Sequence, residues 1–162
     1  MKKITYPIFL FILLIFINGC VGYEPIFGST NSQFEIADYS IEGNKILGNK
    51  IYSKLYSLSK SKRDDQNLRS VDLVIKISKD KNATVKDSAG KILQYKITLN
   101  TDVKIIDFIT KDKILNQIFI SSLIYKVQNK YSDTVDLENQ IIENLLSKTY
   151  QELVIKLAQN LK

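Results

Sequence analysis

Apolar and polar residues alternate along the middle of the chain, which predicts β-strands that each bury one face. In segment 34–41 the two-residue period slips near Ala37 and Asp38, so we expect a strand with a β-bulge at that point. Residues 71–77 alternate as a half-buried strand, and residues 83–85 predict a short strand of their own. This part of the sequence therefore predicts a sheet.

The clearest alternation runs over residues 93–105 and predicts the central strand of the sheet. Turn residues at 87–90 precede it, and a charged turn at 111–113 follows it. A last strand is predicted over 119–127. Its second face also carries apolar residues, at Ile118, Ile120 and Ile124. We therefore expect part of that face to be covered, either by a helix or by another protein.

Two segments change to a period of 3.6 residues and predict amphipathic helices. Asn44 can cap the first helix, and Gly48 within it costs about 1 kcal/mol relative to alanine, so this helix depends on packing. Its apolar positions are Leu47, Ile51, Leu55 and Leu58. The second helix is predicted over 133–161 and has glutamates on its polar face, which is typical of a helix on a core rather than on a membrane surface.

The order of these elements is strand, helix, three or four strands, helix. Runs of strands with separate helices are typical of an α+β fold. We therefore expect a two-layer sandwich, in which a mostly antiparallel sheet of four to five strands carries two helices packed on one side.

The start of the chain predicts a cleavable signal peptide. Lys2 and Lys3 precede ten consecutive apolar residues, 8–17, and this is the polarity order of a secretory leader. A membrane-spanning helix would need about 20 apolar residues. We expect a lipoprotein signal peptide over 1–19, a lipidated cysteine with a tether over 20–32, and a single α+β domain over 33–162.

Cys20 is the only cysteine of the chain and the predicted lipidation site. An exported protein with one thiol cannot form an internal disulfide, so the thiol needs another role, and the alternative is a buried or unpaired cysteine. Ile17, Asn18, Gly19 and Cys20 resemble a bacterial lipobox, whose cysteine is acylated. This resemblance implies three acyl chains, enough for stable anchoring. Val21 after the cysteine, in place of Asp, implies sorting to the outer membrane.

Lysines concentrate in the predicted sheet. The formal net charge is +6, and the segment from Lys76 to Lys113 alone contains nine lysines and five aspartates. An excess of this kind suits an anionic partner. The alternative is that the lysines cover solvent-facing strand positions, where they discourage edge pairing. Nucleic acid is not expected as a partner, because export separates the protein from it.

The sequence lacks the residues of common catalytic sites. It contains no histidine, which excludes histidine-based acid–base catalysis, Ser-His and Cys-His triads and histidine-ligated metals. No glycine-rich phosphate loop is present, and the acidic residues form no recognisable pair. We expect a protein that is not an enzyme, with no metal site and no cofactor.

A short segment after the cysteine resembles a known family. It reads Gly22-Tyr23-Glu24-Pro25-Ile26-Phe27-Gly28. This is similar to the Gly-aromatic-x-Pro-aliphatic-aromatic stretch that follows the lipidated cysteine in alphaproteobacterial lipopolysaccharide-assembly lipoproteins, the LptE family, although Val21 is one residue more than usual. The order of elements is also similar. The resemblance implies a lipid-anchored protein on the periplasmic side of the outer membrane of a Gram-negative cell. It would plug the LptD β-barrel, aid its assembly and help deliver lipopolysaccharide to the outer leaflet.

The resemblance also implies that basic residues on the sheet and its loops bind lipopolysaccharide. We predict this role for the lysines at the two charged turns, Lys86, Lys91, Lys111 and Lys113. The alternative is that they are ordinary solvated lysines. Three other functions are compatible with parts of the sequence. The first is a generic outer-membrane lipoprotein that binds a periplasmic partner or peptidoglycan, the second a lipid-binding or lipid-transfer module, and the third a secreted hydrolase, for which the sequence offers no cleft.

Overall fold

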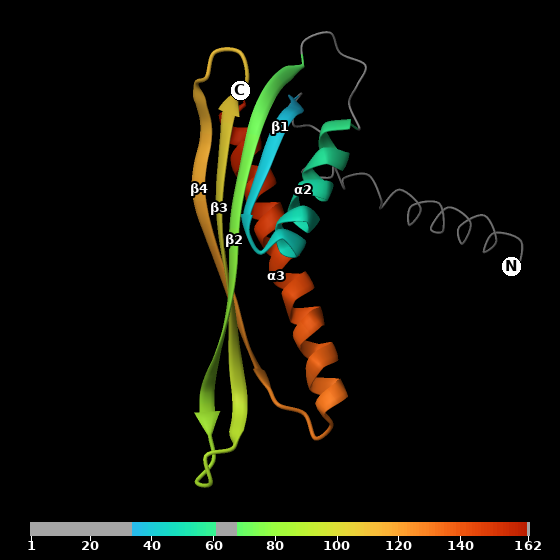
Figure 1. Ribbon diagram of the computed structural model, residues 1–162, viewed down its shortest axis with the longest axis vertical. Coiled ribbons are helices and arrows are strands. Elements are labelled where there is room, and N and C mark those ends of the chain that lie inside the picture. The colour runs from blue at the N-terminus through green and yellow to red at the C-terminus, as the bar shows by residue number, and fades with distance from the viewer. Residues whose placement is uncertain (1–33, 61–67, 162) are drawn as a thin grey trace, which may run out of the picture. The chain divides into compact units, whose positions relative to one another are not determined.

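The computed structural model describes residues 34–60 and 68–161. The predicted signal peptide, Cys20, the tether and the family-like segment from Gly22 to Gly28 lie outside the described residues. Six elements follow one another in Figure 1: β1 (Phe34–Gly43), α2 (Lys45–Lys60), β2 (Arg69–Lys86), β3 (Ile92–Asp107), β4 (Lys113–Lys126) and α3 (Tyr131–Asn160).

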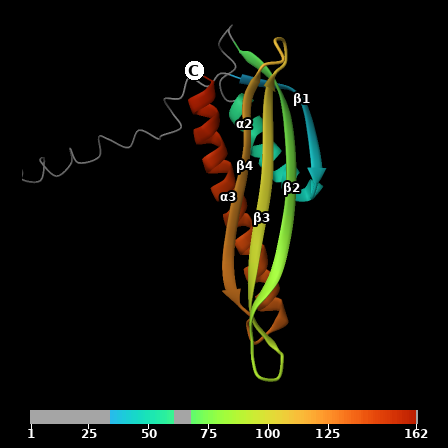
Figure 2. The ribbon, with the colours of Figure 1, turned by 90° about the vertical axis from the view of Figure 1, so that its left-hand side faces the viewer.

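The four strands form one sheet in the order β1-β2-β3-β4. β1 pairs parallel to β2, and the other two pairs are antiparallel. Both helices lie on the same side of the sheet, α2 over β1 and β2 and α3 over β3 and β4, as Figures 1 and 2 show. The predicted α+β sandwich, with a mostly antiparallel sheet and two helices on one side, is confirmed with four strands.

The β1–α2 corner follows the sequence closely. The register of β1 against β2 shifts between Ile36 and Asp38, at the predicted bulge. Gly43 ends the strand with φ +76°, and a Cβ there would overlap the Ile77 carbonyl oxygen, so glycine is required.

Asn44 then caps α2, because its Oδ1 accepts a hydrogen bond from the Leu47 N–H at 3.2 Å. Gly48 lets α2 approach β1, since a Cβ at this position would overlap the Ile41 side chain. The glycine that weakens α2 as an isolated helix thus allows its close packing on β1, as the predicted dependence on packing requires.

The core lies between the helices and the inner face of the sheet. Ile75, Leu99 and Val103 are fully buried on β2 and β3, and Leu153 of α3 is fully buried in the same core. Further residues with at most 1% exposure are Ile51, Leu55, Val71, Leu73, Ile77, Ile97, Ile105, Leu146 and Leu157. Alternate strand positions and one stripe of each helix therefore supply the core, as the two periodicities predict.

β2 differs from its prediction. It is one strand of 18 residues, not a strand over 71–77 and a separate short strand over 83–85. The intervening residues are polar and give no alternation, but they pair with β3, for example Lys79 with Leu99 and Lys81 with Ile97. β4 likewise begins at Lys113, several residues before its predicted start. Pairing with a well-defined neighbour extends both strands beyond their own sequence signal.

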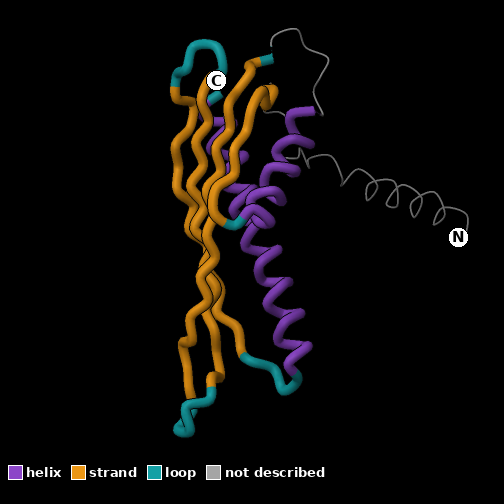
Figure 3. The backbone as a smooth tube through the Cα atoms, in the orientation of Figure 1, coloured by secondary structure: helices purple, strands orange, loops and turns teal. Residues whose placement is uncertain are grey.

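The outer face of β4 is exposed. Ile118, Ile120 and Ile124 retain 55%, 67% and 55% of their accessible surface. Figure 3 shows both described helices on the opposite side of the sheet, so neither covers these residues. Of the two predicted covers, a helix within the described part of the chain is thereby ruled out, and a second protein stays a prediction.

Candidate ligand-binding groove

The β2–β3 hairpin continues beyond the part of β2 that the helices cover. The inner-face positions Leu73, Ile75 and Ile77 of β2 are buried, but from Ser78 to Lys86 the strand is exposed. The alternation still places Lys79 and Lys81 on the inner face, toward α3. Two lysines therefore follow two isoleucines on the same side of one strand.

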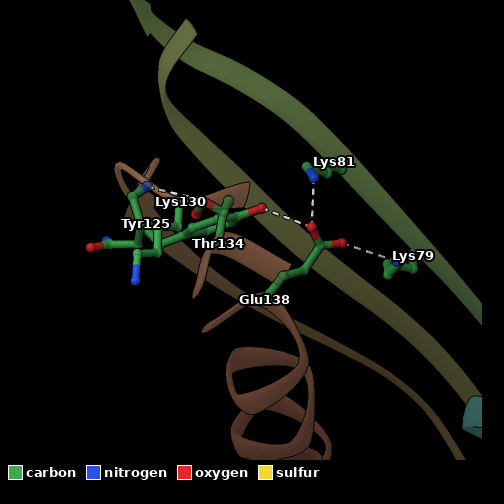
Figure 4. A network of polar contacts seen from close by, with 7 residues as sticks. Lys79, Lys81, Tyr125, Lys130, Thr134 and Glu138 are labelled. Atoms are coloured by element: carbon green, nitrogen blue, oxygen red, sulfur yellow. Dashed lines mark hydrogen bonds and ion pairs between the residues drawn. The ribbon is translucent and has the colours of Figure 1, made fainter. Parts of the chain in front are cut away.

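These two lysines meet Glu138 of α3, as Figure 4 shows. The Lys81 ammonium group lies 2.5 Å from Glu138 Oε2, and the Lys79 ammonium group lies 3.4 Å from Oε1. The Tyr125 hydroxyl of β4 donates a hydrogen bond to Oε2 at 3.0 Å. The Glu138 side chain is 15% exposed and lies at the edge of the core. Its carboxylate accepts hydrogen bonds from three donors there. We call Lys79, Lys81, Tyr125 and Glu138 the Glu138 cluster.

Aromatic rings support the cluster. The Lys81 ammonium group lies 4.3 Å from the centroid of the Tyr95 ring, within cation–π range. Tyr95 and Tyr125 face each other across β3 and β4, with ring centroids 5.9 Å apart. This packing orients Lys81 toward the carboxylate.

The electrostatic balance keeps the cluster charged. Burial raises the pKa of Glu138, but the hydrogen bonds from Lys81 and Tyr125 outweigh burial and leave this pKa below its ordinary value. Burial lowers the pKa of Lys81, and its hydrogen bond to Glu138 reverses this, so the pKa of Lys81 is raised. Burial also raises the pKa of Tyr125, which therefore stays a hydrogen-bond donor.

The turn of the hairpin and the start of α3 face each other beside this cluster. Asp87 Oδ1 accepts hydrogen bonds from the Ala89 and Lys91 N–H groups, each at 2.9 Å, and Gly90 has φ +82°, which confirms the predicted turn. At the start of α3, Thr134 Oγ1 accepts the Gln128 N–H at 2.9 Å. These contacts fix both walls of a groove.

The groove has a volume of about 600 Å³ and combines apolar walls with charged groups. Apolar contacts come from Leu93, Val127 and Val135, whereas Lys81, Lys91 and Glu138 supply charge; its other lining residues are Ile92, Tyr95, Gln128, Asn129, Tyr131 and Thr134. An apolar groove with cations at one side suits an amphiphile with an anionic head group.

The predicted lysines do not come together in one site. Lys86 and Lys91 flank the hairpin turn, and only Lys91 lines the groove. Lys111 and Lys113 lie at the other end of β3, a strand of 16 residues, or about 50 Å at about 3.3 Å per residue. There the Lys111 ammonium group is 3.0 Å from Asp72 Oδ2 and 4.5 Å from the Phe108 ring centroid. Binding by any of the four stays a prediction.

Sequence reasoning missed the Glu138 cluster. Continuing the β2 alternation past Ile77 places Lys79 and Lys81 on the core side, and this signal was present in the sequence. Glu138 could not be assigned to them, because the contact joins positions 57 and 59 residues apart.

Within residues 34–60 and 68–161, no group of three or more Asp, Glu, Cys or His side chains is arranged to hold a metal ion. The helices in the same described ranges are not apolar enough over a sufficient length to cross a membrane.

The fold is similar to that of three solved lipoprotein structures. Rare lipoprotein B of Shewanella oneidensis aligns with a TM-score of 0.54 at 8% identity, over 75% of this chain and 94% of that chain. A predicted lipoprotein of Caulobacter crescentus gives 0.53 at 14% identity, over 83% and 94%. An uncharacterized lipoprotein B of Nitrosomonas europaea gives 0.52 at 11% identity, over 75% and 82%. No family model matches the sequence, and no curated protein matches it either. At these identities the likeness establishes the fold, which is that of the rare lipoprotein B structures.

Proposed function

We propose that this chain is a lipid-anchored component of the lipopolysaccharide export machinery at the outer membrane, held through Cys20 and seated in a β-barrel of the LptD type. The observation that carries the proposal is the fold, which is shared with rare lipoprotein B over 75% of this chain. Two independent features of the sequence agree with it, the lipobox-like segment at Cys20 and the LptE-like segment from Gly22 to Gly28. In this role the protein binds and positions lipopolysaccharide and carries out no chemistry.

The groove supports lipopolysaccharide as the ligand. Lipopolysaccharide joins acyl chains to phosphates, and the groove places Leu93, Val127 and Val135 beside the ammonium groups of Lys81 and Lys91. Lysine binds phosphate as a point charge and is not selective for shape. These lysines therefore attract the phosphorylated head group without selecting one arrangement of its phosphates.

The outer face of the sheet supports a protein partner. Ile118, Ile120 and Ile124 form an exposed apolar stripe on β4, and stripes of this kind mark interaction sites. This stripe also favours the second candidate function, a generic outer-membrane lipoprotein that binds a periplasmic partner. Co-purification of the lipidated chain in mild detergent separates the two functions. A large β-barrel should accompany the chain if the first proposal is right, and its absence would contradict that proposal.

Charge reversal at the two ends of β3 tests the binding site. The variant Lys86→Glu/Lys91→Glu changes the hairpin end, and Lys111→Glu/Lys113→Glu changes the opposite end by the same charge. We expect the hairpin variant to bind purified lipopolysaccharide about tenfold more weakly, because phosphate attraction becomes repulsion near the groove, and the second variant to bind much like the wild type. Binding is measured by surface plasmon resonance with the lipidated protein. Equal losses in both variants, or none in either, would contradict the groove as the site.

A further inference from the structure

We infer that the Glu138 carboxylate is a built-in occupant of an anion site formed by Lys79, Lys81 and Tyr125, and that a phosphate of an amphiphile bound in the groove displaces it. The inference rests on the proposed function, because it describes how the same groove takes up its ligand.

The donors of the cluster suit a phosphate as well as they suit a carboxylate. Two ammonium groups and one hydroxyl converge on Glu138 from two strands, at 2.5, 3.4 and 3.0 Å. All of them donate hydrogen bonds to oxygen, and none depends on the planar shape of a carboxylate. A phosphate monoester brings up to two charges and three acceptor oxygens, whereas Glu138 brings one charge and two oxygens. The ligand group can therefore satisfy the same donors at least as fully.

The ligand can reach one of these donors directly from the groove. Lys81 and Glu138 both line it, whereas Tyr125 is buried and Lys79 is not among the lining residues. A phosphate in the groove therefore meets the Lys81 ammonium group first, and Lys79 and Tyr125 become available as Glu138 moves away. Lys91 lines the same groove, and the described residues give its ammonium group no hydrogen bond or ion pair. The groove therefore contains one lysine without a partner among the described residues, Lys91, and one lysine paired with Glu138, Lys81, so a phosphate can contact Lys91 before it exchanges with Glu138.

Displacement of Glu138 changes how the hairpin is held. Beyond Ile77, β2 is exposed, and among the described residues Lys79 and Lys81 join this part of the strand to α3 through Glu138. When a phosphate takes these lysines, the ties between the outer half of β2 and α3 are lost. Ligand uptake then loosens the hairpin from the helix, which gives the fold a means to signal that the groove is filled.

The variant Glu138→Gln tests the inference in the full lipidated chain. The amide keeps the size of the side chain but removes its charge, so we expect lipopolysaccharide to bind about fivefold more tightly than to the wild type. Dephosphorylated lipopolysaccharide should bind both proteins equally. Glu152→Gln is the matched control, because Glu152 lies on the same helix but pairs with Lys148 and does not line the groove, and it should leave binding unchanged.

Hydrogen exchange provides a second readout. In Glu138→Gln, the amides of residues 79–86 should exchange faster than in the wild type, and lipopolysaccharide should produce the same acceleration in the wild type. If the wild type binds lipopolysaccharide but Glu138→Gln binds it equally or more weakly, the exchange mechanism is overturned and the proposed function stands. If the wild type fails to bind it but Glu138→Gln binds inorganic phosphate more tightly than the wild type does, the anion site stands and the proposed function falls. Failure of both probes in both proteins overturns both.

Discussion

The two halves of β2 contrast within one strand. In the first half, Leu73, Ile75 and Ile77 are at most 1% exposed and are held by burial beneath the helices. In the second half, the same inner-face alternation continues with Lys79 and Lys81, which are held by a carboxylate. Burial of a large aliphatic side chain contributes about 1.5–3 kcal/mol, whereas a partly exposed ion pair contributes up to about 1 kcal/mol. We therefore expect the outer half of β2 to open more readily than the first half, and the outer half carries Lys81, which lines the candidate groove.

The largest test of this contrast uses two leucines of β3. Leu99 is fully buried under α3, and Leu93, at the hairpin end, is 41% exposed. We expect Leu99→Ala to reduce the free energy of unfolding by about 4 kcal/mol, because it removes buried methyl groups and leaves a cavity. Leu93→Ala should reduce it by less than about 1 kcal/mol. Urea denaturation followed by circular dichroism measures both.

The two substitutions are matched in residue type, strand and size of change. We call α2, α3 and the part of the sheet that they cover, which includes the first half of β2, the body. A comparable loss in both variants would mean that the hairpin end packs as tightly as the body, and the contrast would be wrong. Leu93→Ala also removes an apolar contact from the groove, so its effect on lipopolysaccharide binding should exceed its effect on stability.

A second, smaller test uses two glycines with left-handed backbones. Gly43 in the body has φ +76°, and a Cβ added there would overlap the Ile77 carbonyl oxygen. Gly90 in the hairpin turn has φ +82°, and a Cβ added there would meet open space. Gly43→Ala should destabilise the fold by about 3 kcal/mol, since overlap with the backbone adds to the strain of the left-handed conformation. Gly90→Ala should incur the strain alone, about 1 kcal/mol, and mainly in the hairpin.

Thermal unfolding measures the first effect, and hydrogen exchange of the hairpin amides measures the second. Equal shifts in melting temperature for the two variants would show that backbone strain, and not packing, dominates at Gly43.

The same contrast explains what the sequence predicts well. The body combines strong alternation with caps and turns of specific chemistry, such as Asn44 and the Asp87 turn, and these local signals were confirmed. Residues 78–82 are polar, so their strand conformation depends on pairing with β3, which a local pattern does not contain. The Glu138 cluster is harder still to predict from the sequence, because Lys81 and Glu138 meet only through the packing of α3 on the sheet.

The predicted lysine site shows a related difficulty. The charged turns at 87–90 and 111–113 share a composition, which suggested one anionic surface. However, the predicted strand between them already implies opposite ends of the sheet, because an antiparallel strand carries its two turns at its two ends. The excess of lysine suggests an anionic partner. Which lysines share one surface depends on the order and direction of the strands.

The smallest expected effect is a change in how the stability of the fold depends on low pH, through Asp107. Asp107 closes the β3–β4 turn in the body, where it accepts hydrogen bonds from Arg69 Nε at 2.6 Å and from the Ile109 and Thr110 N–H groups at 2.9 Å. The Thr110 N–H and Arg69 lower the pKa of Asp107 from 3.8 to about 2. Because the folded pKa lies below the unfolded one, Asp107 stabilises the fold above about pH 4, and this stabilisation is lost as the pH falls toward about 2. Asp107→Asn should therefore flatten the decrease in urea midpoint between pH 4 and pH 2.

Glu138 provides the counterpart of Asp107 in the hairpin. Its pKa is also lowered, against burial, by Lys81 and Tyr125, so its contribution is likewise present at neutral pH and lost on acidification. That contribution holds the outer half of β2, so acid should lower the protection of the hairpin amides, measured as the ratio of intrinsic to observed exchange rate at each pH. Glu138→Gln should flatten this loss of protection and leave the pH dependence of the urea midpoint close to that of the wild type. If Glu138→Gln instead flattens the urea profile as Asp107→Asn does, the hairpin and the body unfold as one cooperative unit. A hairpin that could open only with the whole domain could not respond to a ligand in the groove, so this titration decides whether the two halves of β2 are separate in function as well as in packing.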